Sequence, residues 1–409
     1  MIPDRIRLPD AARAAIRRLP SALDALRATL KVYALTPDSP ESMATVLEHQ
    51  ARRIPDHDCV VFEGQRWNYR DFNAWANRIA HALRGQGVHR GDTVGLLFHN
   101  GPALLACVAA VAKLGAVAGL LNPHQRGAVL AHSLGLIQPR RIVVGDACLD
   151  ALASACEPPK DEPWLWAGDG PTPAGLLSLP EACAQAGTGN PALTAPVRAG
   201  DAFCFVFTSG TTGLAKMVRH DFTHPLGHII TARYWQQVRE DELHLSVSDS
   251  GWAKFGWGKI YGQWICGATV FGYDMKKFVP TMLMQKVQDY GIRTFCVPPT
   301  MYRFMLQEDV SAYDLSSVRT WTTAGEPLNP EVTKQWEELT GKKVVVIGSG
   351  ATAVTIVPAM TKGGAAHVTQ LQRTPTYMVS RPARDRIANT LRKFLPEKLA
   401  YALTRLKNI

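Results

Sequence analysis

The stretch FCFVFTSGTTGLAK, residues 203–216, decides the fold, because a short apolar run passes directly into a loop of glycines and hydroxyl residues. Such a run followed by Gly, Ser and Thr is typical of a buried strand that ends in a tight turn. Gly210 and Gly213 allow the backbone to turn closely and to present its N–H groups to a ligand. Further donors come from the side chains of Thr208, Ser209, Thr211, Thr212 and Lys216. Many short donors beside one positive charge suit a polyphosphate.

This loop is not a Walker A motif, because the pattern GxxxxGK[ST] is absent from residues 208–216. Met217 and Val218 follow Lys216 directly, and these apolar residues predict a returning strand instead of a helix. A simple polar hairpin is the alternative interpretation. The order of the residues after a buried strand favours phosphate binding.

On both sides of the loop, helix and strand patterns alternate from residue 41 to residue 341. Asn68 and Asp71 resemble a capping box at the start of a helix that Gly85 would end. Strands are expected over residues 94–98, 117–121, 141–144 and 203–207, with helices over residues 102–113 and 125–137 between them. This alternation indicates an α/β fold with a parallel sheet that is covered by helices on both faces.

One long apolar stretch, from Ala103 to Leu121, raises the question of a membrane span. Lys113 is its single charged residue, and Gly115 interrupts it. A buried helix followed by a buried strand is therefore the favoured interpretation.

Composition places the chain among soluble globular proteins, with 46% apolar and 20% charged residues over 409 positions. The formal charge of +10 favours anionic partners such as nucleotides, CoA-type thiols or a membrane surface. Nucleic acid is not expected, because the basic residues are scattered and no nucleic-acid-binding motif is present. Eight cysteines without a CxxC pair indicate reduced thiols and a cytoplasmic protein, and no metal site is predicted.

The chain divides into three predicted regions. Residues 1–40 form a basic helical arm with apolar residues on one face, and either docking on the domain or contact with a membrane surface explains it. Residues 41–340 form the main α/β region, in which the Pro- and Gly-rich residues 157–200 are expected to be a surface excursion or linker. Residues 341–409 carry a separate signature.

The loop TSGTTGLAK resembles the phosphate-binding signature of the adenylate-forming (AMP-binding) superfamily, with Ala215 in place of the usual proline. WNYRDFNAWANRIAHAL, AKLGAVAGLLN, SDSGWAKFGWGKIYGQW and TAGEPLNPEV resemble fatty- and medium-chain acyl-CoA synthetases, so that the resemblance covers about residues 41–341. It implies ATP-dependent activation of a carboxylic acid, by way of an acyl-adenylate, to acyl-CoA. ATP, Mg²⁺ and CoA are the implied substrates and cofactors.

The resemblance also assigns residues. Thr208, Ser209, Gly210, Thr211, Thr212, Gly213 and Lys216 would bind the phosphates, with Thr211 and Lys216 as catalytic residues. Ala324, Gly325, Glu326 and Pro327 would lie along the adenine, and Gly251 and Trp252 would line the acyl pocket. Trp252 could equally be a core residue. His220 could contact the acyl site or be structural.

Past residue 341 the family pattern is not kept. A Tyr-Gly-x-Thr-Glu motif is expected after the strand of residues 344–347, but GSGATA follows, and the next acidic residue is Asp385. A later Thr-Gly-Asp motif and a C-terminal domain with a catalytic lysine are also missing. The sequence therefore predicts a truncated adenylate-forming N-terminal domain, with parallel sheets flanked by helices, whose activity is in doubt.

The segment GKKVVVIGSGATA instead has the layout of a dinucleotide-binding βαβ unit. Gly348, Gly350 and Ala353 form its GxGxxA pattern, and Arg373 stands in the second expected strand, where a 2′-phosphate would bind. Residues 341–409 resemble the NADP-binding segment of flavin-containing (Baeyer–Villiger type) monooxygenases. A Rossmann-like fragment joined to the first family at Gly341 is the resulting expectation.

Three functions stay open at this point: an acyl-CoA synthetase, a non-catalytic nucleotide-binding protein, and an NADP-dependent oxidoreductase fragment. The expected partners are a small-molecule acid and a nucleotide, together with membrane contact as the alternative reading of the basic arm. The expected location is the cytoplasm or the surface of a membrane.

Overall fold

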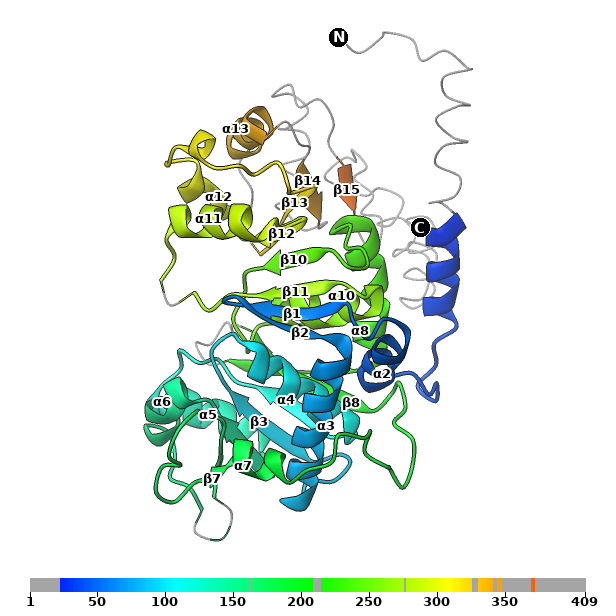
Figure 1. The fold of residues 1–409 in the computed structure, drawn as a ribbon, viewed down its shortest axis with the longest axis vertical. Coiled ribbons are helices and arrows are strands. Elements are labelled where there is room, and N and C mark those ends of the chain that lie inside the picture. Colours follow the sequence, from blue (N-terminus) through cyan, green and yellow to red (C-terminus); the bar gives the residue numbers. More distant parts are fainter. Residues whose placement is uncertain are drawn as a thin grey trace, which may run out of the picture.

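The computed structural model describes residues 23–159, 161, 163–208, 215–275, 277–325 and 330–340, and the backbone of residues 344–347 and 369–371. Within these residues the chain forms two sheets with a layer of helices between them and further helices outside (Figure 1). The predicted α/β architecture with parallel sheets flanked by helices is confirmed.

The first sheet has the described strand order β15-β14-β13-β12-β10-β11-β1-β2. Every neighbouring pair in it is parallel except the β1–β2 hairpin. The strands are β1 Asp58–Phe62, β2 Gln65–Asn68, β10 Leu243–Ser246, β11 Thr269–Gly272, β12 Thr294–Val297, β13 Thr320–Thr323, β14 Val344–Ile347 and β15 Thr369–Leu371.

The second sheet has the described order β7-β6-β5-β3-β4-β8-β9, and here the antiparallel pair is β8–β9. Its strands are β3 Thr93–Leu97, β4 Val117–Leu120, β5 Arg141–Val144, β6 Leu165–Trp166, β7 Leu177–Ser178, β8 Ala202–Thr208 and β9 Lys216–Asp221.

Helices cover both faces of each sheet. Neighbouring residues of one strand point to opposite faces, so each strand contributes side chains to two different cores. Leu96 belongs to the core between the sheets, whereas Leu97 belongs to the outer core beneath α5 and α6. The inner layer contains α2 Met43–Arg53, α3 Tyr69–Gly85, α4 Pro102–Lys113 and α10 Tyr261–Cys266, and the outer helices are α5 Gly127–Ile137, α6 Leu149–Ala153, α11 Pro280–Tyr290, α12 Pro299–Met305 and α13 Pro330–Thr340. Shorter pieces are α7 Leu179–Ala184, α8 Thr223–Gly227, α9 Ala253–Phe255, the 3₁₀ turns η1 Asp146–Cys148 and η4 Val310–Ala312, and the π-type turns η2 Thr231–Trp235 and η3 Gly256–Ile260.

The predicted elements between residues 68 and 144 are confirmed with shifts of at most two residues at their ends. Asn68 caps α3, because its Oδ1 accepts a hydrogen bond from the backbone N–H of Asp71 at 2.7 Å, and α3 ends at Gly85. The apolar stretch from Ala103 to Leu121 forms the buried helix α4 and the buried strand β4. No helix in the described part of the chain is long and apolar enough to cross a membrane.

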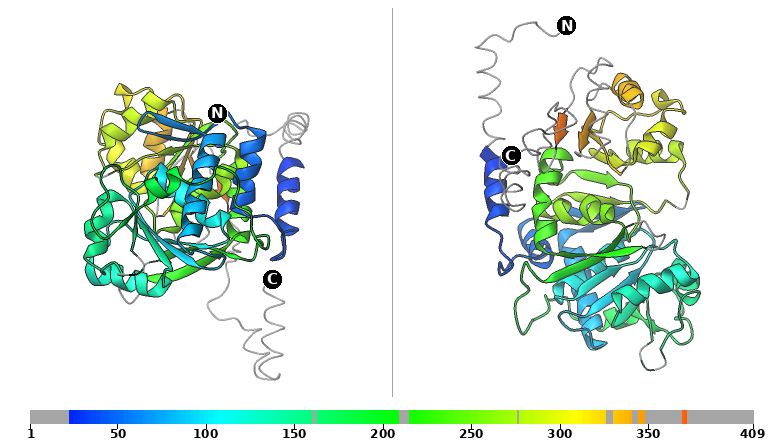
Figure 2. Two further views of the ribbon diagram at one scale, coloured as in Figure 1. Left: turned by 60° about the horizontal axis from the view of Figure 1, so that its bottom comes forward. Right: turned by 180° about the vertical axis from the view of Figure 1, so that it is seen from behind.

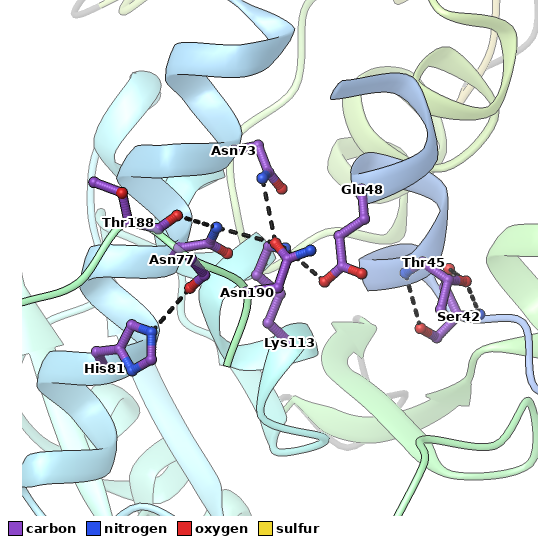
Figure 3. A network of polar contacts seen from close by, with 10 residues as sticks. Ser42, Thr45, Glu48, Asn73, Asn77, His81, Lys113, Thr188 and Asn190 are labelled. Atoms are coloured by element: carbon purple, nitrogen blue, oxygen red, sulfur yellow. Dashed lines mark hydrogen bonds and ion pairs between the residues drawn. The ribbon is translucent and has the colours of Figure 1, made fainter. Parts of the chain in front are cut away.

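Lys113, the charged residue of that stretch, is buried at the end of α4 and is hydrogen-bonded to Glu48 and Asn190 (Figure 3). Its Nζ donates to Glu48 Oε1 at 2.8 Å and to Asn190 Oδ1 at 3.1 Å. Burial lowers the pKa of Lys113, and the carboxylate of Glu48 partly opposes this. Asn77 on α3 donates to the same Asn190 oxygen at 3.0 Å. The group thus joins α2, α3 and α4 to the segment that precedes β8.

Residues 157–200, for which the sequence predicts a surface excursion or linker, include short strands and a helix. They contain β6, β7 and α7, and the two short strands extend the second sheet next to β5. Trp164, Leu165 and Trp166 are buried. Strands of two residues are too short to show an alternation of apolar and polar residues. The sequence prediction for this segment therefore rests on its Pro- and Gly-rich composition.

Strand β14 lies beyond the predicted boundary at residue 341, and it pairs in parallel with β13 of the first sheet. Strand β15 pairs in turn with β14. Both strands were expected in this segment, and they are hydrogen-bonded into the sheet that precedes them. The residues of the GxGxxA pattern and Arg373 lie outside the described residues.

The basic arm is described from residue 23, and residues 23–33 form a helix along one side of the molecule (Figure 2). Its inner face is docked: Ala28 is buried, and Asp24 Oδ2 accepts a hydrogen bond from the hydroxyl of Tyr234 at 2.7 Å. Its outer face is exposed and carries Leu23, Leu26, Arg27, Leu30 and Lys31.

Candidate functional site

The carboxyl ends of strands from both sheets meet at one place, where loops after parallel strands commonly bind ligands. The segment after β10, a strand of the first sheet, contacts the ends of β4 and β8 in the second sheet. Ser250 Oγ donates to the carbonyl of Leu121, after β4, at 2.8 Å. The backbone N–H of Phe207, near the end of β8, donates to the carbonyl of Gly251 at 2.8 Å.

The predicted phosphate loop leaves the second sheet at this meeting point. Thr208 and Lys216 are paired across the antiparallel β8–β9 ladder, and both are exposed. The predicted returning strand is therefore confirmed as β9. The imidazole Nε2 of His132 on α5 lies 3.1 Å from the carbonyl oxygen of Ala215. Ser209, Gly210, Thr211, Thr212 and Gly213 lie outside the described residues.

Gly251 and Trp252 lie directly beside the start of this loop. Gly251 has φ +85°, and a Cβ there would stand 2.9 Å from the backbone nitrogen of Asn122. Only glycine fits both the conformation and the close approach. Trp252 forms a bridge with Phe207 and is 45% exposed, so its side chain is not a core residue. The structure thus brings the two predicted acyl-pocket residues together with Thr208.

The predicted adenine-binding residues begin where β13 ends. Ala324 is half-buried, and Gly325 is exposed with φ +107°. Strand β13 is separated from β10 by β12, and all three strands are parallel. Glu326 and Pro327 lie outside the described residues.

A chain of polar contacts, which the sequence analysis did not identify, links these loops. Lys259 is buried, and its Nζ donates to Asn100 Oδ1 at 3.1 Å and to the carbonyl of Ser248 at 3.1 Å. Asn100 Nδ2 donates to Asp249 Oδ1 at 2.9 Å. The second carboxylate oxygen of Asp249 lies 3.3 Å from His124 Nε2. Burial lowers the pKa of Lys259 to about 8, and the charge of Asp249 opposes the shift.

The contacts extend to a second His–Asp pair. The ring of His124 meets the ring of His99 edge to face at 5.5 Å between centroids. His99 Nδ1 lies 3.6 Å from Asp274 Oδ1, after β11. A sequence signal for part of this group existed, because His99 and Asn100 follow β3 after one apolar residue, and Asn122 follows β4 after one apolar residue.

His220 belongs to a histidine cluster around the buried Tyr261. Its Nδ1 lies 3.1 Å from the hydroxyl oxygen of Tyr261, and its ring packs on that of His224 at 3.9 Å. Burial lowers the pKa of His220 to about 4 and that of His228 to about 3, so both are neutral at pH 7. These contacts hold His220 within the cluster around Tyr261.

The described residues contain no group of three or more His, Cys, Asp or Glu side chains that could hold a metal ion. Lys216 and the hydroxyls around it are suited to anions instead.

Comparison with known proteins agrees with this geometry. A family model described as "AMP-binding enzyme" matches residues 47–387. The chain belongs to the AMP-binding enzyme family. The family match crosses Gly341, and the comparisons give no support to the resemblance of residues 341–409 to monooxygenases.

Among curated members of the AMP-binding enzyme family, the human mitochondrial acyl-coenzyme A synthetase ACSM3 is 29% identical over 310 residues, which are 74% of this chain and 51% of that protein. The 4-hydroxybutyrate–CoA ligase 1 of Metallosphaera sedula is 32% identical over 283 residues, or 69% of this chain and 48% of that protein. The chain therefore spans about half the length of the curated relatives it matches.

Solved structures share the fold. The anthranilate CoA ligase AuaEII, solved with anthranoyl-AMP, matches with a TM-score of 0.68 at 23% identity and covers 76% of this chain and 60% of that chain. The N-terminal domain of FACL13 from Mycobacterium tuberculosis matches with a TM-score of 0.63 at 23% identity, covering 74% of each chain.

Proposed function

We propose that this member of the AMP-binding enzyme family activates a carboxylic acid of the fatty-acid type with ATP and transfers the acyl group to CoA. One observation carries the proposal: Thr208 and Lys216, the two ends of the predicted phosphate loop, pair next to Phe207, which contacts Gly251 and Trp252 where strand ends of both sheets meet. A loop that binds the triphosphate there would hold the α-phosphate beside an exposed aromatic side chain. An apolar acid would pack against that side chain.

Two steps follow from this arrangement. A carboxylate oxygen of the acid attacks the α-phosphorus of ATP, and pyrophosphate leaves with the bond electrons. The resulting acyl-adenylate then reacts with a thiol, and AMP leaves. In the first step the ammonium group of Lys216 and the loop N–H groups offset the negative charge that moves onto the phosphates. Mg²⁺, when bound with ATP, supplies further positive charge.

Pyrophosphate release tests the proposal directly. Purified protein, ATP and Mg²⁺ would be incubated with a series of saturated fatty acids of increasing length. Lys216→Ala should lower the rate by about 10²–10³, the usual effect of losing one preorganised contact to the developing charge. Lys334→Ala is the matched control, because Lys334 is an exposed lysine on α13 that pairs with Glu338. Equal rates for the wild type and Lys216→Ala would count against the role of the loop.

A second candidate is a nucleotide-binding protein without turnover. The sequence after β14 favours it, because no acidic residue stands between Gly341 and Asp385 to hold a metal ion near the phosphates. Saturable ATP binding in equilibrium dialysis, together with no pyrophosphate release for any acid, would support this candidate. Sustained acyl-CoA formation would exclude it.

The dinucleotide-binding role of Gly348, Gly350, Ala353 and Arg373 stays a prediction of the sequence. Flavin absorbance of the purified protein and oxidation of NADPH are its two measurements. A colourless protein that leaves NADPH unchanged ends this reading.

Peripheral membrane contact is a further part of the proposal. The exposed face of the helix over residues 23–33 combines Leu23, Leu26 and Leu30 with Arg27 and Lys31, a combination suited to an anionic lipid surface. Co-sedimentation with vesicles of phosphatidylcholine and phosphatidylserine should exceed that with phosphatidylcholine alone. The double variant Leu26→Gln/Leu30→Gln should abolish the difference. If this variant co-sedimented in the same way as the wild type, membrane contact through Leu26 and Leu30 would be excluded.

A further inference from the structure

His124 and Asp249 form a pair with the geometry of a general base and its orienting carboxylate. The imidazole Nε2 lies 3.3 Å from Asp249 Oδ2, so the carboxylate holds the proton on that nitrogen. The other ring nitrogen, Nδ1, then carries a lone pair that can accept a proton. The side chains of His124 and Asp249 are 52% and 41% exposed, and a reactant can therefore approach.

Hydrogen bonds hold the pair at the point where the two sheets meet. Asp249 receives a hydrogen bond from Asn100, which in turn binds the buried ammonium group of Lys259. The backbone N–H of His124 donates to Asn122 Oδ1 at 2.9 Å, which fixes the turn that carries the imidazole. A base that is oriented by a second group, itself hydrogen-bonded, is the usual arrangement around an activated nucleophile.

The turn of His124 also touches the proposed acyl site. Gly251 approaches the backbone of Asn122 so closely that a Cβ would stand 2.9 Å from its nitrogen. Trp252 follows directly. His124 thus stands two positions after Asn122, the residue through which this turn contacts the proposed acyl pocket.

We propose that His124 is the general base for the thiol in the second step, with Asp249 as its positioning residue. The inference rests on the proposed function, because it assumes that an acyl-adenylate is formed beside Trp252. A thiol is mostly protonated at neutral pH, since its pKa is about 8.5, and it is a poor nucleophile in that form. His124 Nδ1 takes the S–H proton while sulfur bonds to the acyl carbon. The bond from that carbon to the phosphate oxygen of AMP breaks, AMP leaves with the electron pair, and the imidazolium returns its proton to water.

The two half-reactions separate this inference from the function on which it rests. ATP–pyrophosphate exchange reports adenylate formation and needs no thiol. Synthetic acyl-adenylate mixed with protein and CoA, followed by chromatography of the acyl-CoA, reports the second step and needs no ATP. His124→Ala should slow the second step by about 10²-fold or more and leave exchange nearly unchanged. Added imidazole should restore part of the rate.

A loss confined to the second step is a readout that a merely structural role would not give. Asp249→Asn keeps the size of the positioning side chain but removes the carboxylate that faces His124 Nε2, so the second step should slow while exchange stays nearly unchanged. His89→Ala is the matched control, because His89 faces Asp92 in a similar exposed pair outside the site.

Each outcome decides a point. Loss of the second step alone in His124→Ala supports the inference. An unchanged second step overturns it, and so does an equal loss of both half-reactions with a lowered melting temperature. If the wild type converts synthetic acyl-adenylate to acyl-CoA but shows no exchange, the role of His124 in the second step stands. Adenylation as the proposed function would then be overturned. A wild type that performs neither half-reaction would overturn both.

Discussion

The backbone N–H of Phe207 donates to the carbonyl of Gly251 at 2.8 Å, which ties the strand before the predicted phosphate loop to the predicted acyl pocket. The contact joins the two sheets, because β8 belongs to one and the segment after β10 belongs to the other. Gly251 makes it by adopting φ +85° against the backbone of Asn122. The relative position of phosphate and acyl group would therefore depend on this glycine.

Gly251→Ala should disturb the site and destabilise the fold by about 1–3 kcal/mol, because the new Cβ meets the backbone of Asn122 and the residue keeps a left-handed conformation. Gly291→Ala separates the two causes, since Gly291 also has positive φ (+62°) but has no atom within 4 Å of the position of a Cβ. Urea unfolding and ATP–pyrophosphate exchange measure the effects. If both variants lost the same stability and kept the same exchange rate, the contact with Asn122 would have no special importance.

The buried ion pair of Lys113 and Glu48 predicts a second stability effect. Lys113→Met leaves the Glu48 carboxylate without its donor, whereas the Asn190 amide oxygen keeps the hydrogen bond from Asn77, and the loss should be about 3 kcal/mol in urea unfolding. Glu48→Leu in the same chain removes the stranded carboxylate, so the double variant should recover part of the loss. Arg66→Met provides the control, because the pair of Arg66 and Asp58 lies at the surface and should contribute less than about 1 kcal/mol. A double variant with strictly additive losses would show that the two side chains do not interact.

Local patterns predicted the elements whose cause is local. The cap at Asn68, the end of α3 at Gly85 and the break between α4 and β4 at Gly115 all follow from residues within the element itself. The alternation of these elements was sufficient to predict parallel sheets between helices. The hairpin of β8 and β9 was also visible, because two apolar runs flank the loop.

Contacts between distant segments could not be predicted in the same way. Asn100 and Asp249 are 149 positions apart, and Lys259 is 159 positions from Asn100, so no window of the sequence contains the pair. The pairing of β14 with β13 is another such contact. The GxGxxA pattern in residues 341–409 carries no local signal for this pairing of β14 with β13. Strands β6 and β7 were missed because they have only two residues each.

Acid should destabilise the protein through His244. This residue is fully buried, with its Nδ1 2.8 Å from Thr294 Oγ1, and burial lowers its pKa to about 3. In the unfolded chain the histidine pKa is near 6.5, so the unfolded state binds this proton at a higher pH than the folded state does. Stability contributed by neutral His244 is therefore complete above pH 6.5 and falls as pH decreases toward 3, by about 1.4 kcal/mol per pH unit.

His244→Asn should make the urea midpoint less dependent on pH between 6.5 and 4, although the variant can be less stable at pH 7. Some slope should remain, because burial also lowers the pKa of His228, to about 3. His89→Asn should leave the slope unchanged, since the side chain of His89 is 78% exposed. Identical slopes for wild type and His244→Asn would assign the acid sensitivity to other groups.

The eight thiols should differ sharply in reactivity, because seven of them are buried and Cys156 is half-buried. Burial raises the pKa of Cys148 and of Cys183 to about 11 and that of Cys204 to about 12, so these groups are thiols at neutral pH as well as inaccessible. Short treatment of the native protein with iodoacetamide, followed by peptide mass spectrometry, should find Cys156 alkylated first. The same treatment in concentrated urea should modify all eight at similar rates, and Cys156→Ser should remove the fast phase. Early alkylation of Cys107 or Cys204 in native buffer would mean that the helices between the two sheets open far more readily than their packing implies.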